Sequence, residues 1–346
     1  MKIMTEGKDW RRKMGKLVAV LSLFTVFLAV ILAGCGQGQQ AGSSSGGGGA
    51  NQPGTKYPTR PIEFIVPWGA GGGADQLART CAEKLDKILN VSLPVVNVPG
   101  ATGGTGMTKL LAASADGYSI AIYIADTHAL LATSKPSWKL EDITPVARMI
   151  KAPSFLFVKQ DSPIKTWQDF EKMTREKPGQ LKVSTLGEGS VDDITLAYLA
   201  GKGIKVTGVP YAQPSERYVS ILGGHADALY EQAGDVRQYL ESKQMRPIIV
   251  FNEERYPAFP DVPCSKELGY DIFLPQFRSI IVRAGTDEQK IKTLAEALKK
   301  VYDTPEYQKF LEQQYATKDS YLGPEDAARM LKQEVDNMKA IWEKKQ

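Results

Sequence analysis

The chain has 346 residues and a formal net charge of +4. Residues 1–34 carry six Lys/Arg and two acids and account for this excess, so the remaining 37 basic and 37 acidic residues balance. The sequence pI of 8.7 therefore does not indicate binding to nucleic acid, and any charge selectivity must be local. His128 and His225 lie far apart in the sequence and belong to no cluster with metal-ligand spacing, so no metal site is predicted.

The N-terminus indicates the compartment. A basic segment is followed by an apolar run from Leu17 to Ala33, interrupted only by Ser22 and Thr25. A basic flank, a short apolar core and small residues before a cleavage site predict a secretory signal over residues 1–34. The alternative is an uncleaved N-terminal anchor, and both interpretations place the rest of the chain outside the cytoplasm.

The apolar run ends in Leu32-Ala33-Gly34-Cys35. This tetrad resembles the lipobox of bacterial lipoproteins, which implies that Cys35 becomes the lipid-bearing first residue. Residues 35–55 are rich in Gly, Gln and Ser and are expected to form a flexible tether. The protein is therefore expected at the outer face of the cell membrane, or in the periplasm, anchored through Cys35.

From Lys56 onward roughly 290 residues remain, more than one compact core usually holds, so two domains are expected. Short β runs alternate with helical periods, which predicts sheets covered by helices. Strands are predicted at 62–66, 94–98, 119–124, 154–158, 181–184, 205–209, 226–230, 246–251 and 277–282. Helices are predicted at 74–89, 105–113, 167–175, 191–201, 214–222 and around 236–240. Residues 253–269 are interpreted as a Pro-rich loop with a short helix, and residues 287–345 as three amphipathic helices.

The loop Pro67–Asp75 follows the first strand and opens directly onto a helix. Its glycines permit positive φ and close approach of a ligand, and the free N–H groups of the helix start favour an anion. The segment could pass for a dinucleotide fingerprint, but Asn97–Gly100 stands where an acidic residue would hold a ribose. The alternative is a tight strand-to-helix turn without a ligand, with Asp75 as a local cap.

A second loop of the same type, Ser184–Ser190, precedes the helix that starts at Val191, and Ser190 is well placed to cap that helix. One such loop in each domain favours a ligand held between two helix N-termini. A small molecule with a carboxylate at each end fits that arrangement, whereas capping without a ligand is the alternative.

Several short runs are specific when taken together and in order. They are Tyr57–Ile62, Ile65–Gly72, Asn97–Gly104, Ala115–Tyr118, Val209–Tyr211, Gly223-Gly224, Arg255–Pro257, Pro260–Pro263 and Glu267–Gly269. In this order they resemble the solute receptors of the tripartite tricarboxylate transporter family, also known as Bug receptors, over the whole folded body.

The resemblance implies a two-lobed, periplasmic-binding-protein-like α/β fold, each lobe a mainly parallel sheet flanked by helices. We expect residues 56–152 plus 276–346 to form the first lobe and 153–275 the second, with hinge closure at crossovers near Ala152 and Phe273–Phe277. The implied function is capture of a small carboxylate, without a cofactor, by a monomer that delivers it to integral-membrane transporter subunits. The implied ligand contacts are Trp68, Ala70, Gly73, Ala74, Ser184, Gly187 and Ser190, with Thr127, in the turn Ala125–Thr127, and Tyr211 as walls.

The chain departs from the family pattern in two places. Asp192-Asp193 stands where members commonly carry His, and Ala212-Gln213 replaces a frequent Lys-Gly. With Glu188 and Glu231, the second lobe is unusually acidic, which would favour a ligand with an amine as well as a carboxylate. The alternative is that these acids are solvated or complement a helix N-terminus.

Two other functions are compatible with the same fold. One is a receptor that presents its ligand to a membrane histidine kinase, and the other is a secreted enzyme. Neither histidine neighbours a nucleophile in the sequence, so a receptor without catalysis is favoured. Cys81 and Cys264 are compatible with either a disulfide or two free thiols.

Overall fold

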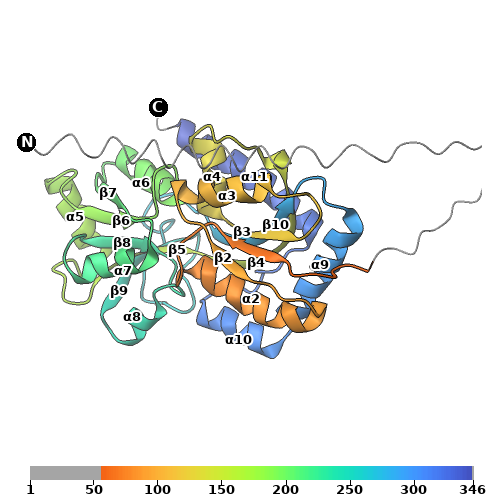
Figure 1. The fold of residues 1–346 in the computed structure, drawn as a ribbon. Coiled ribbons are helices and arrows are strands. Elements are labelled where there is room, and N and C mark those ends of the chain that lie inside the picture. The colour runs from red at the N-terminus through yellow and green to blue at the C-terminus, as the bar shows by residue number, and fades with distance from the viewer. Residues whose placement is uncertain (1–55, 345–346) are drawn as a thin grey trace, which may run out of the picture. The chain divides into compact units, whose positions relative to one another are not determined.

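Two five-stranded sheets organise the protein in a computed structural model that describes residues 56–344 (Figure 1). The first sheet has the order β2-β1-β3-β10-β4. Its strands are β1 Glu63–Val66, β2 Val95–Asn97, β3 Ser119–Ile124, β4 Ile143–Ala152 and β10 Gln276–Arg283. The predicted signal (1–34), tether (35–55) and lipid-attachment residue Cys35 lie outside the described residues.

The second sheet has the order β7-β6-β8-β5-β9. Its strands are β5 Ser154–Lys159, β6 Lys182–Thr185, β7 Thr207–Pro210, β8 Ala228–Glu231 and β9 Met245–Phe251. The chain enters this sheet directly from β4 into β5, with only Pro153 between them, and returns to the first sheet at β10.

Both sheets are mixed, which corrects the expectation of mainly parallel sheets. In the first sheet β1 is parallel to β2 and β3, whereas β10 is antiparallel to β3 and β4. In the second, β6 is parallel to β7 and β8, whereas β5 is antiparallel to β8 and β9. The antiparallel strands β5 and β10 are those that the chain enters from the other sheet, so they run against the strands built by local β-α-β connections.

Helices cover both faces of the first sheet, because alternate residues of its strands point to opposite faces. Phe64 of β1 belongs to the core under α2 (Gly73–Leu89), α9 (Glu288–Tyr302) and α10 (Pro305–Gln313). The next residue, Ile65, belongs to the core under α3 (Gly104–Ala112), α4 (Ala125–Thr133) and α11 (Pro324–Glu343). Figure 1 shows α3, α4 and α11 on one side of this sheet and α2 and α10 on the other.

The second sheet is covered in the same way. Phe155 and Phe157 of β5 pack on the side of α7 (Pro214–Leu222) and α8 (Arg237–Glu241). Leu156 and Val158 pack on the side of α5 (Trp167–Glu176) and α6 (Val191–Gly201). We call the first sheet with α2–α4 and α9–α11 the first lobe, and the second sheet with α5–α8 the second lobe. The apolar core continues between them, because α4 and α11 both contact α6.

Three local expectations from the sequence were wrong. The predicted turn Ala125–Thr127 begins α4, and β4 was not predicted. Ala125–Leu130 are all buried, so α4 has no amphipathic stripe to reveal it. Residues 253–269 contain turns and one bridge between Val250 and Cys264 but no helix, because three prolines interrupt the segment.

Two further observations concern the described residues as a whole. No helix within 56–344 is long and apolar enough to cross a membrane. Cys81 in α2 and Cys264 are both buried and are not joined by a disulfide.

Candidate ligand-binding site

The loop after β1 brings the start of α2 against the second lobe. Gly72 is the N-cap of α2 and its end carries no side-chain cap. A Cβ on Gly69 would overlap Gln213 and Pro214 at the start of α7, and a Cβ on Gly73 would overlap Arg278 and Asp235. Glycine at these two positions therefore allows the lobes to approach closely.

The loop after β6 brings the start of α6 against the first lobe. Gly187 and Gly189 have φ of 152° and 77°, which L side chains rarely adopt. Ser190 is buried and caps α6, its hydroxyl accepting from the Asp193 N–H at 3.4 Å. The first N–H of the helix, that of Val191, donates to Oδ1 of Asp126 in α4 at 3.1 Å. A carboxylate from the opposite lobe therefore occupies this helix N-terminus.

Two further hydrogen bonds hold the β6–α6 loop on the first lobe. The Thr102 hydroxyl donates to the Glu188 carbonyl at 2.9 Å, and the Thr133 hydroxyl donates to the Gly189 carbonyl at 2.9 Å. Both acceptors are backbone carbonyls, so these contacts position the backbone of the loop rather than a particular side chain.

Four ionisable side chains form a buried group between the lobes, which we call the interlobe charge cluster: Asp126, Asp192, Arg217 and Glu231. Each is at most 2% exposed. Arg217 of α7 pairs through Nη2 with Glu231, and its Nη1 lies 4.0 Å from Oδ2 of Asp192. The same Asp192 oxygen accepts from the Leu186 N–H at 2.8 Å.

The electrostatics of the cluster oppose full ionisation. Burial raises the pKa of Asp126 to about 6, although the charge of Arg217 acts in the opposite direction. Burial, together with the neighbouring Asp126 carboxylate, raises the pKa of Asp192 well above its usual range. Two carboxylates next to one another are thus held in a region with too little positive charge to neutralise both.

A second buried pair crosses between the lobes. Arg278 of β10 donates through Nη2 to Oδ2 of Asp235 at 2.5 Å, and its Nη1 donates to Oε1 of Gln314 at 3.2 Å. Asp235 is 8% exposed and Arg278 5% exposed. This pair joins the strand β10 to the segment between β8 and α8 and stabilises contact between the lobes.

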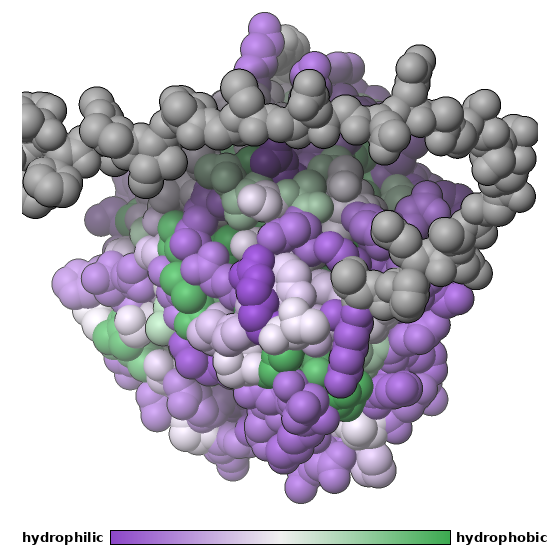
Figure 2. Space-filling model, turned by 45° about the vertical axis from the view of Figure 1, so that its right-hand side comes forward, coloured by the Kyte–Doolittle hydropathy of each residue, from purple (hydrophilic) through white to green (hydrophobic). Residues whose placement is uncertain are grey.

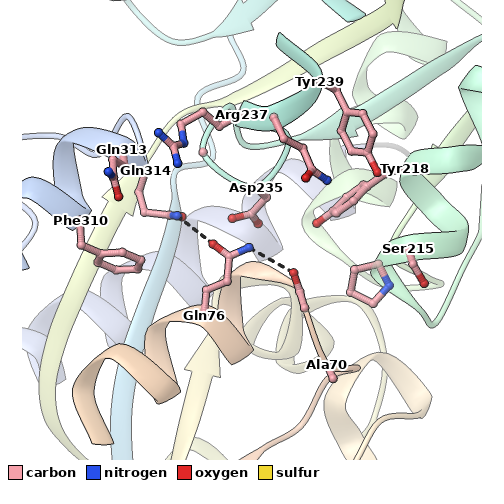
Figure 3. A pocket seen from close by; sticks show the side chains of 14 residues that line it. Ala70, Gln76, Ser215, Tyr218, Asp235, Arg237, Tyr239, Phe310, Gln313 and Gln314 are labelled. Carbon is pink, nitrogen blue, oxygen red and sulfur yellow. Dashed lines mark hydrogen bonds between the residues drawn. The ribbon is translucent and has the colours of Figure 1, made fainter. Parts of the chain in front are cut away.

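A cavity of about 320 Å³ opens beside this pair (Figure 3). The first lobe contributes Ala70, Gly71, Gln76 and the end of α10, and the second lobe contributes Tyr218 and the residues around Asp235. Gln314 donates to Gln76, which donates to the Gly71 carbonyl, both at 3.1 Å, so the first-lobe wall is held by amide side chains. The cavity is lined from both lobes and leads toward the loop after β1.

Comparison with known proteins decides the family. Residues 77–346 match the family model "Tripartite tricarboxylate transporter family receptor". A UPF0065 protein from the gbd 5' region of Cupriavidus necator is 30% identical over 291 residues, covering 84% of this chain and 88% of that protein. The chain belongs to the tripartite tricarboxylate transporter receptor family.

Solved structures show the same fold. MatC from Rhodopseudomonas palustris with bound malate superposes with a TM-score of 0.77 at 23% identity, covering 83% of this chain and all of that chain. The periplasmic binding protein BugD superposes with a TM-score of 0.77 at 24% identity, covering 84% of this chain and 98% of that chain. The family and these neighbours are solute-binding receptors rather than enzymes.

The residues predicted from the receptor-family motifs fall into two groups in the structure. Trp68, Gly73 and Ala74 are buried around the start of α2, and Ala70 is exposed and lines the cavity. Ser184 is buried at the end of β6 and donates to the Arg217 carbonyl at 3.3 Å.

Thr127 and Tyr211 are the two predicted walls. Thr127 is buried next to Asp126 in α4, and its hydroxyl has no hydrogen-bond partner within residues 56–344. Tyr211 is half-buried, and its N–H donates to the Thr185 carbonyl at 3.0 Å. Thr127 therefore lies beside the charge cluster, and Tyr211 follows the edge strand β7.

Sequence reasoning missed Arg217 and Arg278. Arg217 has a detectable signal, because Pro214, Arg217, Tyr218 and Ile221 follow the spacing of a buried helical face. A charged residue on such a face indicates a buried ionic partner. Arg278 stands in the apolar strand β10, where the same argument applies.

The buried histidine His128 of α4 makes two hydrogen bonds. No group of three metal-ligating side chains occurs in the described part of the chain. His128 is buried between the Tyr123 hydroxyl at 3.0 Å and the Leu331 carbonyl at 2.8 Å, and burial lowers its pKa to about 4. His128 is therefore a neutral link between α4 and α11.

Exposed apolar side chains do not offer another obvious site. Ile88 and Val219 are the large hydrophobic residues exposed within 56–344. The face in Figure 2 is mainly hydrophilic, with apolar residues in small separate areas. The buried ionisable side chains between the lobes are therefore the more informative feature.

Proposed function

We propose that this receptor captures a small carboxylate, such as a di- or tricarboxylate or an amino-acid-like molecule, between its two lobes. We further propose that it delivers this ligand to the membrane subunits of a tripartite tricarboxylate-type transporter. Malate bound to MatC, a protein of the same fold, is consistent with a ligand of this size and charge.

One observation carries the proposal. The first N–H of α6, that of Val191, donates to a carboxylate across the lobe boundary at 3.1 Å, the side chain of Asp126. Free N–H groups and the helix dipole favour an anion at this end. We expect a ligand carboxylate to compete with Asp126 for this N–H, between the lobes, where closure would exclude water.

Closure is proposed to occur by hinge motion. The chain passes between the lobes at Pro153 and again before β10, two short segments that can absorb a rotation. The contacts Thr102–Glu188 and Arg278–Asp235 form only when the lobes are together, so they favour the closed form. We propose Cys35 as the lipid attachment site that keeps the receptor at the outer face of the membrane.

Titration calorimetry tests the capture function. The folded body is titrated with a panel of dicarboxylates, tricarboxylates and amino acids, and the expected result is binding of one molecule per chain without turnover. An absence of binding to every acid in the panel would contradict the proposal. Binding followed by chemical conversion of the ligand would instead support an enzyme.

A further inference from the structure

The guanidinium group of Arg278 in β10 is held between the two lobes. On the side of the second lobe, its Nη2 donates to Oδ2 of Asp235 at 2.5 Å and to Oε1 of Gln232 at 3.3 Å. On the side of the first lobe, its Nη1 donates to Oε1 of Gln314 at 3.2 Å. Arg278 and Gln314 are each 5% exposed, so water contributes little to fixing either side chain. The two lobes together therefore set the position of this guanidinium group.

A chain of hydrogen bonds leads from Arg278 to the loop after β1. Nε2 of Gln314 donates to Oε1 of Gln76 in α2 at 3.1 Å. Nε2 of Gln76 in turn donates to the Gly71 carbonyl at 3.1 Å. Figure 3 shows these two hydrogen bonds along one wall of the cavity. These side chains therefore connect the second lobe to the loop backbone that lines the same cavity.

The polarity of this chain is fixed at its Arg278 end. Arginine only donates hydrogen bonds, whereas a glutamine amide has an accepting oxygen and a donating nitrogen. The oxygen of Gln314 must therefore face Arg278, and its nitrogen must face the oxygen of Gln76. The nitrogen of Gln76 is then left to donate, so it requires an acceptor, which is the Gly71 carbonyl. The guanidinium group thus determines which group of the loop turns toward α2.

Local sterics do not determine the orientation of the Gly71–Gly72 peptide group. Gly71 has a φ of 83° and is followed by two further glycines, so several backbone conformations have similar energies. The side chains of Asn97 and Asp75 also bond to this loop, both at 3.0 Å, but they and their partners belong to the first lobe. The hydrogen bond from Gln76 is therefore the link that responds to contact between the lobes.

We propose that Gln314 and Gln76 are positioning residues for the loop after β1. They transmit the docking of Arg278 on the second lobe to the Gly71 carbonyl and hold the Gly71–Gly72 peptide group in one orientation. The C=O and N–H of a trans peptide point in opposite directions, so the chain also sets the direction of the Gly72 N–H at the start of α2. When the lobes separate, Arg278 loses its partners on the second lobe, and its guanidinium group is free to leave Gln314. This inference rests on the proposed function, since it concerns how lobe closure prepares the loop for a ligand.

Isosteric substitution tests the chain, with hydrogen exchange of the amides of residues 69–73, measured without ligand and with the tightest-binding acid of the calorimetric panel. Gln314→Glu keeps the oxygen that accepts from Arg278 and replaces the donating nitrogen by an oxygen. The amide of Gln76 must then reverse, which turns its oxygen toward the Gly71 carbonyl and breaks that hydrogen bond. Loop exchange is expected to become about fivefold faster, and affinity for the acid to fall by about the same factor.

A second variant and a matched control accompany this substitution. Gln76→Glu keeps the acceptor for Gln314 but cannot donate to the loop, and an acid near the start of α2 favours the helix, so this variant should fold. The same fivefold change is expected, whereas a packing role alone would leave the loop unchanged. Gln313→Glu, on the same cavity wall but outside the chain, makes the same change in charge and should stay within about twofold of the wild type.

A double substitution separates transmission from a local effect. Gln76→Met removes both amide groups of the middle residue, and in this background Gln314→Glu should change loop exchange by less than about twofold. An equal effect of Gln314→Glu in both backgrounds, or no effect of either glutamate variant in the wild-type background, would overturn the inference. The capture function stands in that case if the wild type binds an acid. If no acid binds the wild type, the capture function fails, and loop exchange without ligand still decides the inference.

Discussion

The N-termini of α2 and α6 are built from similar glycine loops, yet their acids behave in opposite ways. Asp75 in the first turn of α2 accepts from the Gly71 N–H at 3.0 Å, from Arg79 at 2.9 Å and from Asn97 at 3.0 Å. Burial acts to raise the pKa of Asp75, but these hydrogen bonds together lower it. Asp192 in the first turn of α6 has one free oxygen, and burial raises its pKa.

The difference shows that a glycine-rich strand-to-helix loop does not by itself determine what a helix end does. At α2 every acidic oxygen is used within the same lobe, and the loop glycines serve to admit the opposite lobe. At α6, Asp192 lies near Arg217 of its own lobe, and its pKa is raised by the Asp126 carboxylate of the first lobe. We therefore expect the α2 end to admit the opposite lobe, and the α6 end to hold the buried charges of the interlobe charge cluster.

The largest expected effect comes from removing the one cation of the cluster. Arg217→Met leaves Glu231 and Asp192 without their buried partner and is expected to lower the free energy of unfolding by about 3–5 kcal/mol. Urea unfolding measures it. Arg329→Met, which removes an arginine 71% exposed and paired with Asp326, should change the same quantity by less than about 0.5 kcal/mol. Similar effects of the two substitutions would contradict the buried-charge account.

The pH dependence of stability tests the raised pKa of Asp126. An acid whose pKa is about 6 when folded and roughly 3.9 when unfolded contributes stability that is complete at low pH and is lost as the pH rises through about 6. The unfolding free energy of the wild-type protein relative to Asp126→Asn should therefore fall by about 1–3 kcal/mol between pH 4 and pH 8. A difference that is constant, or that rises with pH, would show that Asp126 is ionised in the folded protein.

The shape role of the loop before α2 is tested by Gly69→Ala. The extra Cβ would overlap Gln213 and Pro214 of the second lobe when the lobes are together, and Gly69 does not have a left-handed φ. Ligand affinity is expected to fall about tenfold, or about 1.4 kcal/mol, as calorimetry would measure. Gly201→Ala, in α6 with no atom within 4 Å of the added Cβ, is the matched control. Unchanged affinity in Gly69→Ala would contradict a role of this contact in ligand binding.

The smallest effect is expected at Glu188. This acid lies on the same loop as Gly187 and Gly189, but its side chain is exposed and only its backbone carbonyl contacts the first lobe. Glu188→Gln should change ligand affinity by less than about twofold, because exposed charges are screened. Thermal-shift titration checks this. A large change would mean that selectivity arises from the surface of the second lobe rather than from its buried acids.

The fold was largely predictable because most strands and helices carry clear periodicity. Val191–Gly201 and Pro214–Leu222 were predicted with the bounds that the structure has, and the three C-terminal helices are present. The helix α4 was missed because burial on every side removes the apolar stripe. The mixed direction of the sheets depends on where the chain crosses between lobes, which no local pattern specifies.

The candidate site was only partly predictable. The two loops follow from glycine and capping chemistry, and the acidity of the second lobe was visible in Asp192 and Glu231. Their partners were not, because Asp126 and Arg217 meet Asp192 only after α4 and α7 have packed against α6 and the second sheet. The position of Arg217 on a buried helical face was an available signal that was not used.

The most direct test is a crystal structure of the complex with the tightest-binding acid of the panel. The account predicts that a small carboxylate lies between the lobes, in contact with residues of both lobes. A ligand that contacts one lobe alone, or that binds outside the space between the lobes, would contradict it.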